Sequence, residues 1–366
     1  MKIKVFIAGM YDNPGGIERI TFDYVSRIKN ENIEFFFLNI YDKMCYQDEL
    51  EKMGCKIFSL PSPKKKLFVF VLEYLKLCEN EKFDIIHINM LSAANILPLL
   101  CAKISGCKNI IVHSHNASTV GFYRHVLHFT NKFFVKLFAN HYFSCSNAAA
   151  KFMFGNKKNV EIIRNAIDIS KYKFDVENRK NFRKKINLPQ NSILIGHIGR
   201  FEKQKNHKFI IRVFNEIFQK NANAFLILIG GGYTMKSIEK LVKKLELAKR
   251  VIFYGKTNNT AEIYSAMDLF LLPSFFEGLP VVGIEAQCNG LPVLASTGIS
   301  AEIQITDLVC RLDLSDGERE WADKSQEMLS RTYERNLFAK EVEKAGYNIE
   351  EKVKNLADLY VEYAQK

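Results

Sequence analysis

Short runs of apolar, often β-branched residues alternate along the chain with longer amphipathic stretches, and the scheme occurs twice. Such alternation is typical of βαβ units, which build a mainly parallel sheet. The first half holds seven predicted strands: Lys2–Ala8, Ile33–Leu38, Lys56–Leu60, Asp84–Ile88, Asn109–His113, His141–Ser144 and Val160–Arg164. The second half holds five: Ser192–Ile198, Ala224–Ile229, Arg250–Tyr254, Asp268–Leu272 and Pro292–Ala295. The pattern therefore predicts two α/β domains.

The boundaries of these domains follow from the same pattern. A length of 366 residues suits two domains of about 150 to 180 residues each. We expect residues 1–168 to form the first domain and residues 191–345 the second, joined by the polar and basic stretch 169–190. Apolar spacing near the end of the chain predicts a helix over residues 346–366 that packs back towards the first domain.

Composition places the chain among soluble globular proteins, with 48% hydrophobic and 25% charged residues. No apolar run reaches the roughly 18 residues that a spanning helix needs, and the apolar stretch at the start is too short for a signal peptide. The eight cysteines include no Cys-x-x-Cys pair, so neither disulfides nor a zinc site are expected. These features predict a cytoplasmic protein.

A formal net charge of +12 is compatible with nucleic acid, an anionic membrane or a phosphorylated substrate as partner. Nucleic-acid binding needs a base-reading motif or a basic stripe with stacking aromatics, and no RNP-like, helix-turn-helix or zinc-finger pattern occurs. We therefore expect no nucleic-acid partner, and the other two partners remain.

The strongest local signal runs from Leu271 to Glu285, where a predicted strand ends in a Glu-Gly-Leu-Pro turn and a helix follows. Gly278 allows close approach of the backbone to a ligand, and Pro280 suits the first helical position. The next N–H groups form a positive helix end that favours an anion such as a diphosphate. The carboxylates of Glu277 and Glu285 can accept hydrogen bonds from sugar or ribose hydroxyls. In the alternative interpretation, Glu277 caps the helix and Glu285 is a solvated surface residue.

Two cations follow the predicted strand Ser192–Ile198. Arg200 and Lys205 can both emerge at its carboxyl end, the edge where open α/β sheets bind ligands. Fixed cations at that edge stabilise the charge of a leaving diphosphate without a metal ion. The alternative is a basic surface loop, because Lys203 and Lys208 lie close by in the sequence.

In the first half, Gly15 and Gly16 lie between a strand and an amphipathic helix that is expected to start near Ile17. Their backbone can come close to a phosphate or a sugar, although a plain turn without a ligand is an equal alternative. His115 follows the fifth strand at its carboxyl end, with polar residues after it, and therefore faces the ligand-binding edge. His87, inside a strand, is interpreted as a core histidine.

Together these segments resemble glycosyltransferase family 4, retaining enzymes of the fold called GT-B. The turn Glu277-Gly278-Leu279-Pro280 with Glu285 is similar to the family's Glu-x7-Glu signature. The resemblance covers most of the 366 residues through five further motifs: Gly15-Gly16-Ile17-Glu18-Arg19, Asp84-Ile85-Ile86-His87, His113-Ser114-His115, Arg164-Asn165-Ala166-Ile167-Asp168, and Gly199-Arg200 with Lys205.

The resemblance implies two facing Rossmann-like domains with a cleft between them and a C-terminal helix that crosses back. It implies a hexosyltransferase that needs neither a metal ion nor a cofactor and takes a nucleotide sugar, with a UDP-sugar favoured. The implied acceptor is a growing, lipid-linked bacterial surface polysaccharide.

The resemblance also implies a role for each matching position. Glu277 would contact hydroxyls of the donor sugar, Glu285 the ribose, and Arg200 with Lys205 the diphosphate. The Gly15-Gly16 turn and His115 would close the site from the first domain, with His115 positioning the sugar or stabilising charge. The base would lie against Tyr254-Gly255-Lys256, with uracil and guanine both left open. Gly230–Gly232 lacks the acidic residue that many relatives place there, so no role is assigned to it.

The segment Phe122–Phe138 predicts a basic, aromatic, amphipathic helix, and Lys64-Lys65-Lys66 precede another apolar stretch. Such features can contact an anionic membrane, which would place the protein at the inner face of the cell membrane. In an equally weighted alternative, the aromatic face belongs to the core and the charges are solvated.

Two other functional classes are kept. One is a nucleotide-sugar epimerase or a sugar phosphorylase on the same fold, and the other is a catalytically silent sugar-nucleotide-binding subunit. An epimerase alters the donor without an acceptor, a phosphorylase depends on inorganic phosphate, and a silent subunit binds the donor without turnover.

Overall fold

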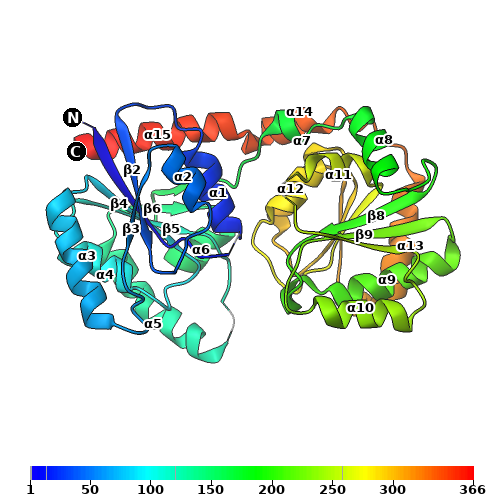
Figure 1. Ribbon diagram of the computed structural model, residues 1–366, viewed down its shortest axis with the longest axis horizontal. Helices are drawn as coiled ribbons and strands as arrows, with labels where there is room; N and C mark the ends of the chain where they lie inside the picture. Colours follow the sequence, from blue (N-terminus) through cyan, green and yellow to red (C-terminus); the bar gives the residue numbers. More distant parts are fainter. Residues whose placement is uncertain (1, 14, 120, 258) are drawn as a thin grey trace. The chain divides into compact units, whose positions relative to one another are not determined.

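The two groups of predicted strands form two separate, all-parallel sheets in the computed structural model, which describes residues 2–13, 15–119, 121–257 and 259–366. One unit holds the residues up to Ala166 together with Ile349–Lys366, and the other holds Ile167–Asn348. In each unit helices cover the sheet (Figure 1). The predicted fold class of two Rossmann-like α/β domains is confirmed.

The sheet of the first unit has the strand order β3-β2-β1-β4-β5-β6-β7. Its strands are β1 (Ile3–Ala8), β2 (Ile33–Asn39), β3 (Lys56–Ser59), β4 (Ile85–Met90), β5 (Asn109–Ser114), β6 (His141–Ser144) and β7 (Val160–Ile162). Its helices are α1 (Gly16–Val25), α2 (Gln47–Lys52), α3 (Leu67–Glu81), α4 (Leu97–Ile104), α5 (Phe122–Phe138), α6 (Asn147–Phe154) and α15 (Ile349–Gln365). The central strands are apolar along almost their whole length because helices cover both of their faces.

The sheet of the second unit has the order β10-β9-β8-β11-β12-β13. Its strands are β8 (Ile193–Ile198), β9 (Ala224–Ile229), β10 (Val251–Gly255), β11 (Leu269–Leu272), β12 (Val293–Ser296) and β13 (Val309–Leu312). Its α-helices are α7 (Ile169–Tyr172), α8 (Val176–Lys185), α9 (His207–Lys220), α10 (Met235–Lys244), α11 (Ala261–Ala266), α12 (Val281–Cys288), α13 (Gly317–Ser330) and α14 (Phe338–Val342).

Each sheet has one point at which the strand order reverses. In the first unit β1 lies between β2 and β4, and in the second β8 lies between β9 and β11. The connections that leave the two central strands run in opposite directions there, which leaves room for a ligand at the carboxyl ends. The loops that follow β1, β4, β8 and β11 are therefore the places to look for a site.

One strand was missed by the sequence pattern. β13 (Val309–Leu312) adds to the outer edge of the second sheet by pairing with β12, with Val309 opposite Val293 and Leu312 opposite Ser296. It is only four residues long and contains Arg311, so its own pattern is too short and too polar to indicate a strand. Its partner in the sheet decides its conformation.

Residues 169–190 do not form the linker that their polar composition predicted. They contribute α7 and α8 to the second unit, and Phe182 and Arg183 are fully buried there. The Arg183 guanidinium donates to the Ala266 carbonyl at 3.0 Å, at the end of α11, and pairs with Asp268 at 2.7 Å. A cation at a helix carboxyl end is stabilising, which explains a buried arginine in a basic stretch. The boundary expected after residue 345 lies after Asn348.

Candidate functional site

The loop after β11 carries Glu277 and is held by backbone hydrogen bonds to the loop after β12. The N–H of Glu277 donates to the carbonyl of Gly298 at 3.2 Å, and the N–H of Ser300 donates to the carbonyl of Glu277 at 3.1 Å. A side chain at Gly298 would meet the carbonyl of Phe275 at 2.1 Å, so a glycine is needed at this crossing. The position of Glu277 is thus fixed by its backbone.

Glu277 and Lys205 form an ion pair between the loops that follow two neighbouring strands. The Nζ atom of Lys205 lies 2.6 Å from Oε2 of Glu277, with 18% and 10% of the two side chains exposed. Ser274 donates its hydroxyl to the other carboxylate oxygen. Lys205 ends a short 3₁₀ turn after β8, so the pair spans the point where the strand order reverses. The structure brings these two predicted residues together.

Glu285 lies on α12 and is half-buried. Its Oε2 atom accepts a hydrogen bond at 2.8 Å from the hydroxyl of Tyr264, which is fully buried. Burial and the nearby Glu285 carboxylate raise the pKa of Tyr264 well above its ordinary value, so the phenol stays a donor. Neither Glu285 nor Glu277 fits its alternative interpretation, because Glu285 is not fully solvated and the residue at the start of α12 is Pro280. Pro280 was predicted at the first helical position, and it lies one residue before the helix, which begins at Val281.

Arg200 lies in the same loop as Lys205 but differs from it in exposure. Its side chain is 54% exposed and pairs with Glu202 at 3.2 Å. Lys203 and Lys208 are exposed as well, so Lys205 alone among these lysines is held by a largely buried ion pair. The structure does not join Arg200 to the Glu277 pair through an ion pair within the described residues.

Glycines bring the loop after β9 against the loop after β8. A side chain at Gly230 would meet the carbonyl of Gly199 at 2.1 Å, and one at Gly232 would meet the carbonyl of Phe201 at 2.5 Å. Gly230 also donates its N–H to the carbonyl of Gly255, the last residue of β10, at 2.9 Å. The loops after β8 and β9 and the end of β10 therefore lie side by side at the carboxyl edge of the sheet.

The predicted base-binding turn Tyr254-Gly255-Lys256 lies at this edge. The ring of Tyr254 packs against Phe182 of α8, with 5.4 Å between the ring centroids. Gly255 has a φ of +85°, and a side chain added there would meet nothing within 4 Å. The partly buried Tyr254 ring therefore packs against the core, while the space beside Gly255 is open.

Two buried histidines under the Lys205 loop were missed by sequence reasoning. His197 on β8 and His207 at the start of α9 are 0% and 2% exposed, and His207 stacks on Phe201 with 4.0 Å between centroids. Burial lowers the pKa of His197 to about 3 and that of His207 to about 2, so both rings are neutral. The two rings are brought together by packing between β8 and α9, which the sequence does not show. The position of His207, two residues after Lys205, was the one feature of the sequence that could have indicated it.

In the first unit, the Gly15-Gly16 turn begins α1. Gly15 precedes the first helical residue, Gly16, so the helix starts one residue before the predicted Ile17. A side chain at Gly16 would meet nothing within 4 Å, whereas one at Gly15 would meet the carboxylate of Glu18 at 2.6 Å. Gly16 therefore faces open space.

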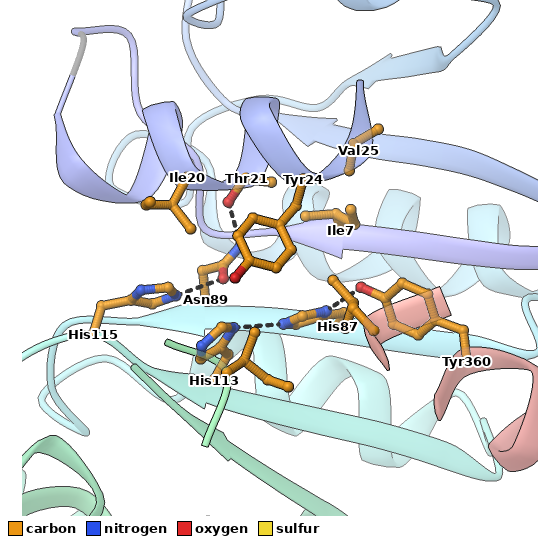
Figure 2. Close-up of a pocket in the computed structure, with 12 residues that line it drawn as sticks. Ile7, Ile20, Thr21, Tyr24, Val25, His87, Asn89, His113, His115 and Tyr360 are labelled. Atoms are coloured by element: carbon orange, nitrogen blue, oxygen red, sulfur yellow. Dashed lines mark hydrogen bonds between the residues drawn. The ribbon is translucent and has the colours of Figure 1, made fainter. Parts of the chain in front are cut away.

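His115 lies at the end of a row of polar side chains inside the first unit, which we call the histidine cluster (His87, His113 and His115). Nε2 of His115 lies 2.8 Å from Oδ1 of Asn89, and His113 lies between His115 and His87 (Figure 2). His87 is buried, as predicted, and its Nδ1 lies 2.6 Å from the hydroxyl of Tyr360 on α15. Burial lowers the pKa of His87 and of His115 to about 3. The cluster is therefore uncharged at neutral pH.

The histidine cluster borders a small cavity that is closed on one side by α1 and on another by α15. The volume open to the centre of a water molecule is about 20 Å³, and about 10–15 Å³ is enough for one water molecule. A nucleotide sugar does not fit this space.

The helices α3, α4 and α5 carry an exposed apolar surface. Of the 20 large hydrophobic side chains that are exposed in the described residues, 13 lie on these helices: Leu67, Phe68, Val69, Leu72, Leu100, Ile104, Phe122, Tyr123, Val126, Phe129, Phe133, Phe134 and Leu137. The alternative in which the aromatic face of α5 is core is wrong, since Phe122 is 86% exposed and Phe133 67%. In the described part of the chain, no helix is both long and apolar enough to cross a membrane.

Two parallel sheets, each in its own α/β unit and each with a point where the strand order reverses, are the architecture of the GT-B fold. Residues 14–171 match the model of glycosyltransferase family 4, and residues 178–345 match that of the glycosyl transferases group 1. The chain therefore belongs to the glycosyltransferases that these two models describe, family 4 in its first part and group 1 in its second.

Similar proteins agree with this assignment. The chain is 26% identical to EpsF of Bacillus subtilis (strain 168), over 97% of this chain and 94% of that one. It is 24% identical to the UDP-Gal:alpha-D-GlcNAc-diphosphoundecaprenol alpha-1,3-galactosyltransferase of Escherichia coli, over 99% and 97% of the two chains. The crystal structure of HepE from Anabaena in complex with UDP superimposes with a TM-score of 0.82 at 18% identity, covering 99% and 100%.

Proposed function

We propose that this glycosyltransferase moves a hexose from a UDP-sugar, with retained configuration, to a growing, lipid-linked surface polysaccharide. The observation that carries the donor assignment is the Lys205–Glu277 pair, where the strand order of the second unit reverses. Two similar proteins support the choice of substrates. HepE was crystallised with UDP-glucose, and the name of the Escherichia coli relative gives UDP-Gal as donor and a diphosphoundecaprenol-linked sugar as acceptor.

The proposed roles of the donor-site residues are those that the family resemblance implies, and the chemistry of each side chain suits its role. Glu277 accepts hydrogen bonds from the donor sugar and Glu285 from the ribose, while Lys205 and Arg200 bind the diphosphate. The turns 254–256 and 278–280 add backbone contacts to the base and the diphosphate. In the first unit, His115 and the turn at Gly15 and Gly16 contact the transferred sugar.

In the proposed reaction the acceptor hydroxyl attacks the anomeric carbon from the face that the diphosphate leaves. The bond from the anomeric carbon to the acceptor oxygen forms as the bond to the diphosphate oxygen breaks, and the hydroxyl proton passes to the leaving diphosphate. The cations of Lys205 and Arg200 stabilise the negative charge of that group, so no metal ion is required.

The donor is tested by thermal unfolding with a set of UDP-sugars and GDP-sugars. A ligand that binds the folded state raises the Tm. At a concentration of 100 times its Kd it stabilises that state by about 2.7 kcal/mol. We expect UDP-sugars to raise it and GDP-sugars to leave it unchanged. A larger shift with a GDP-sugar would contradict the assignment of uracil.

The donor site is tested by transfer from the sugar that binds. Lys205→Met and Glu285→Gln should each lower kcat/KM at least about 100-fold, the usual loss when one stabilising group of a transition state is removed. Lys203→Ala is the matched control, because it removes the same charge from the same turn at an exposed position. Unchanged transfer in both site variants would overturn the site. A donor sugar that is altered without an acceptor would indicate an epimerase. Dependence on inorganic phosphate would indicate a phosphorylase, and binding without turnover a silent subunit.

We also propose that the apolar surface of α3, α4 and α5 lies on an anionic membrane, where a lipid-linked acceptor is found. The sequence of α5 contains Arg124, Lys132 and Lys136 and no acidic residue, and Lys64–Lys66 precede α3. Exposed aromatic side chains beside lysines suit the interface, since the rings enter the headgroup layer and the cations pair with anionic lipids. Figure 1 shows the three helices together in the first unit.

This contact is tested by flotation of the protein with vesicles of phosphatidylglycerol and phosphatidylcholine. Phe122→Ser with Phe133→Ser should abolish binding, whereas Tyr233→Ser, an equally exposed aromatic of the second unit at 71%, should not change it. Transfer to a lipid-linked acceptor should fall in the double variant, and transfer to a short soluble acceptor should stay unchanged. Equal flotation of the double variant and the wild type would contradict the proposal.

A further inference from the structure

Asn89 occupies the point of the first unit at which β1 and β4 lie side by side. It is 6% exposed, near the carboxyl end of β4. Its carbonyl comes so close to the turn after β1 that a side chain at Gly9 would meet it at 2.2 Å. Asn89 therefore lies under the loop that leads to the Gly15-Gly16 turn and beside His115 (Figure 2).

The amide of Asn89 lies between the hydroxyl of Thr21 and the ring of His115. Its Nδ2 atom donates to the hydroxyl of Thr21 on α1 at 3.5 Å, and its Oδ1 atom faces Nε2 of His115 at 2.8 Å. An amide oxygen can only accept, so in this orientation of the amide Nε2 of His115 carries the proton. A neutral imidazole has one donor and one acceptor nitrogen. Nδ1 of His115 is then the acceptor.

The surroundings of His115 keep the ring neutral. The titratable groups that line the same cavity are His87, His113, Tyr24 and Tyr360, and none of its lining residues is a carboxylate, a lysine or an arginine. The ring of His113 lies 4.1 Å from that of His115, so the two rings would repel each other if both were protonated. A neutral ring that accepts at Nδ1 suits a hydroxyl and does not suit a phosphate.

We propose that Asn89 is a positioning residue that fixes the tautomer of His115, so that Nδ1 accepts a hydrogen bond from a hydroxyl of the transferred sugar. The proposal rests on the proposed function, in which His115 contacts that sugar. It narrows the role of His115 to orienting a neutral group and removes the alternative of stabilising charge. In histidines generally, the hydrogen bond made by one ring nitrogen sets which nitrogen carries the proton.

The tautomer is read directly by long-range proton–nitrogen NMR correlation on the full-length protein labelled with ¹⁵N-histidine. The His115 signals are assigned as those missing in His115→Phe. We expect the wild type to show the proton on Nε2, and Asn89→Leu to lose this preference. Tyr360→Phe is the control, because it removes a partner of His87 and should leave the His115 pattern unchanged. A wild-type His115 with its proton on Nδ1 would overturn the proposal.

Kinetics separate positioning from a general effect on folding. Asn89→Leu should lower kcat about 3- to 10-fold, the range that the loss of one hydrogen bond produces, with little change in the donor KM. In a His115→Phe background the same change should cost nothing further. If the two losses multiply, Asn89 acts on the fold and the proposal fails. If His115→Phe alone keeps full activity, the role of His115 in the proposed function fails instead.

A third variant changes the pH profile. The carboxylate of Asn89→Asp stabilises the protonated ring and raises the pKa of His115. Below that pKa both ring nitrogens are donors and Nδ1 no longer accepts, so kcat should fall as the pH decreases and recover as it increases. The wild type should lack this acid limb above pH 5. A pH profile of Asn89→Asp that matches the wild type would overturn the proposal, even if the variant is less stable.

Discussion

Removing the positive charge at position 205 tests whether the Lys205–Glu277 pair is a stabilising as well as a functional feature. In Lys205→Met the methionine fills similar space but carries no charge. The side chain of Glu277, which is only 10% exposed, stays largely buried. It retains the hydrogen bond from Ser274 and loses its cation. The variant therefore leaves an anion largely buried without a countercharge.

The expected cost follows from that geometry. Removing one partner of a buried ion pair costs about 3–5 kcal/mol. The remaining hydrogen bond and the partial exposure of Glu277 place this case at the lower end of that range, at about 3 kcal/mol. For a unit of roughly 150 to 250 residues, 1 kcal/mol changes the Tm by about 2–4 °C, so the second unit should unfold about 6–12 °C lower.

The assay is a double-mutant cycle of Lys205→Met and Glu277→Gln, followed by calorimetry and by transfer. Glutamine keeps the shape and an acceptor oxygen while it removes the buried charge. The double variant should therefore be more stable than Lys205→Met by about 1–2 kcal/mol, although its transfer activity stays lost. Recovery of stability without recovery of activity would show that the charges serve the donor.

Two results would refute this reasoning. If Lys205→Met unfolds at the wild-type temperature, the pair contributes nothing to the fold and Glu277 has other support. If the stability losses of the two single variants add in the double variant, the side chains do not interact in solution.

Three further outcomes follow from the first unit. Gly9→Ala should destabilise this unit by at least about 2 kcal/mol more than Gly54→Ala. Both glycines have a positive φ, +93° and +87°, but only at Gly9 would a side chain meet a carbonyl. Equal melting temperatures of the two variants would contradict this. Tyr360→Phe leaves Nδ1 of His87 buried without its partner and should cost about 1–3 kcal/mol, measured by denaturant unfolding; an unchanged midpoint would show that the bond is not formed. Acidification from pH 7 to pH 5 should lower the stability of the unit, because burial lowers the pKa of the histidine cluster, to about 3 for His87 and His115, whereas the unfolded histidines bind protons below about pH 6.5. The free energy of unfolding should fall by up to about 1.4 kcal/mol per pH unit for each histidine between about pH 6.5 and 3, and a flat profile would contradict the burial of neutral rings.

Much of the fold was readable from the sequence because each element carries its own local pattern. The buried strands are continuous apolar runs, and the helices between them show one apolar face, which is a property of neighbouring residues. The Glu277–Glu285 spacing and the cations after β8 were visible for the same reason. All twelve predicted strands occur within a few residues of their predicted limits.

The tertiary structure decided which of these residues meet. Lys205 and Glu277 are 72 positions apart, and only the adjacency of β8 and β11 brings their loops together. The tautomer of His115 depends on Asn89, which is 26 positions earlier on another strand. No periodicity in the sequence encodes such a distance.

The elements that the pattern missed have the same cause. The edge strand β13 is ordered by its partner β12, and the basic stretch that looked like a linker is held by Arg183, whose donors satisfy the carboxyl end of α11. In both cases local composition favoured a loop, and pairing with a distant segment supplied the free energy for a regular element. The sequence by itself therefore determined most of the elements and the candidate chemistry, while the packing within each unit determined which charges are paired, which histidines are neutral, and which aromatic side chains are left exposed.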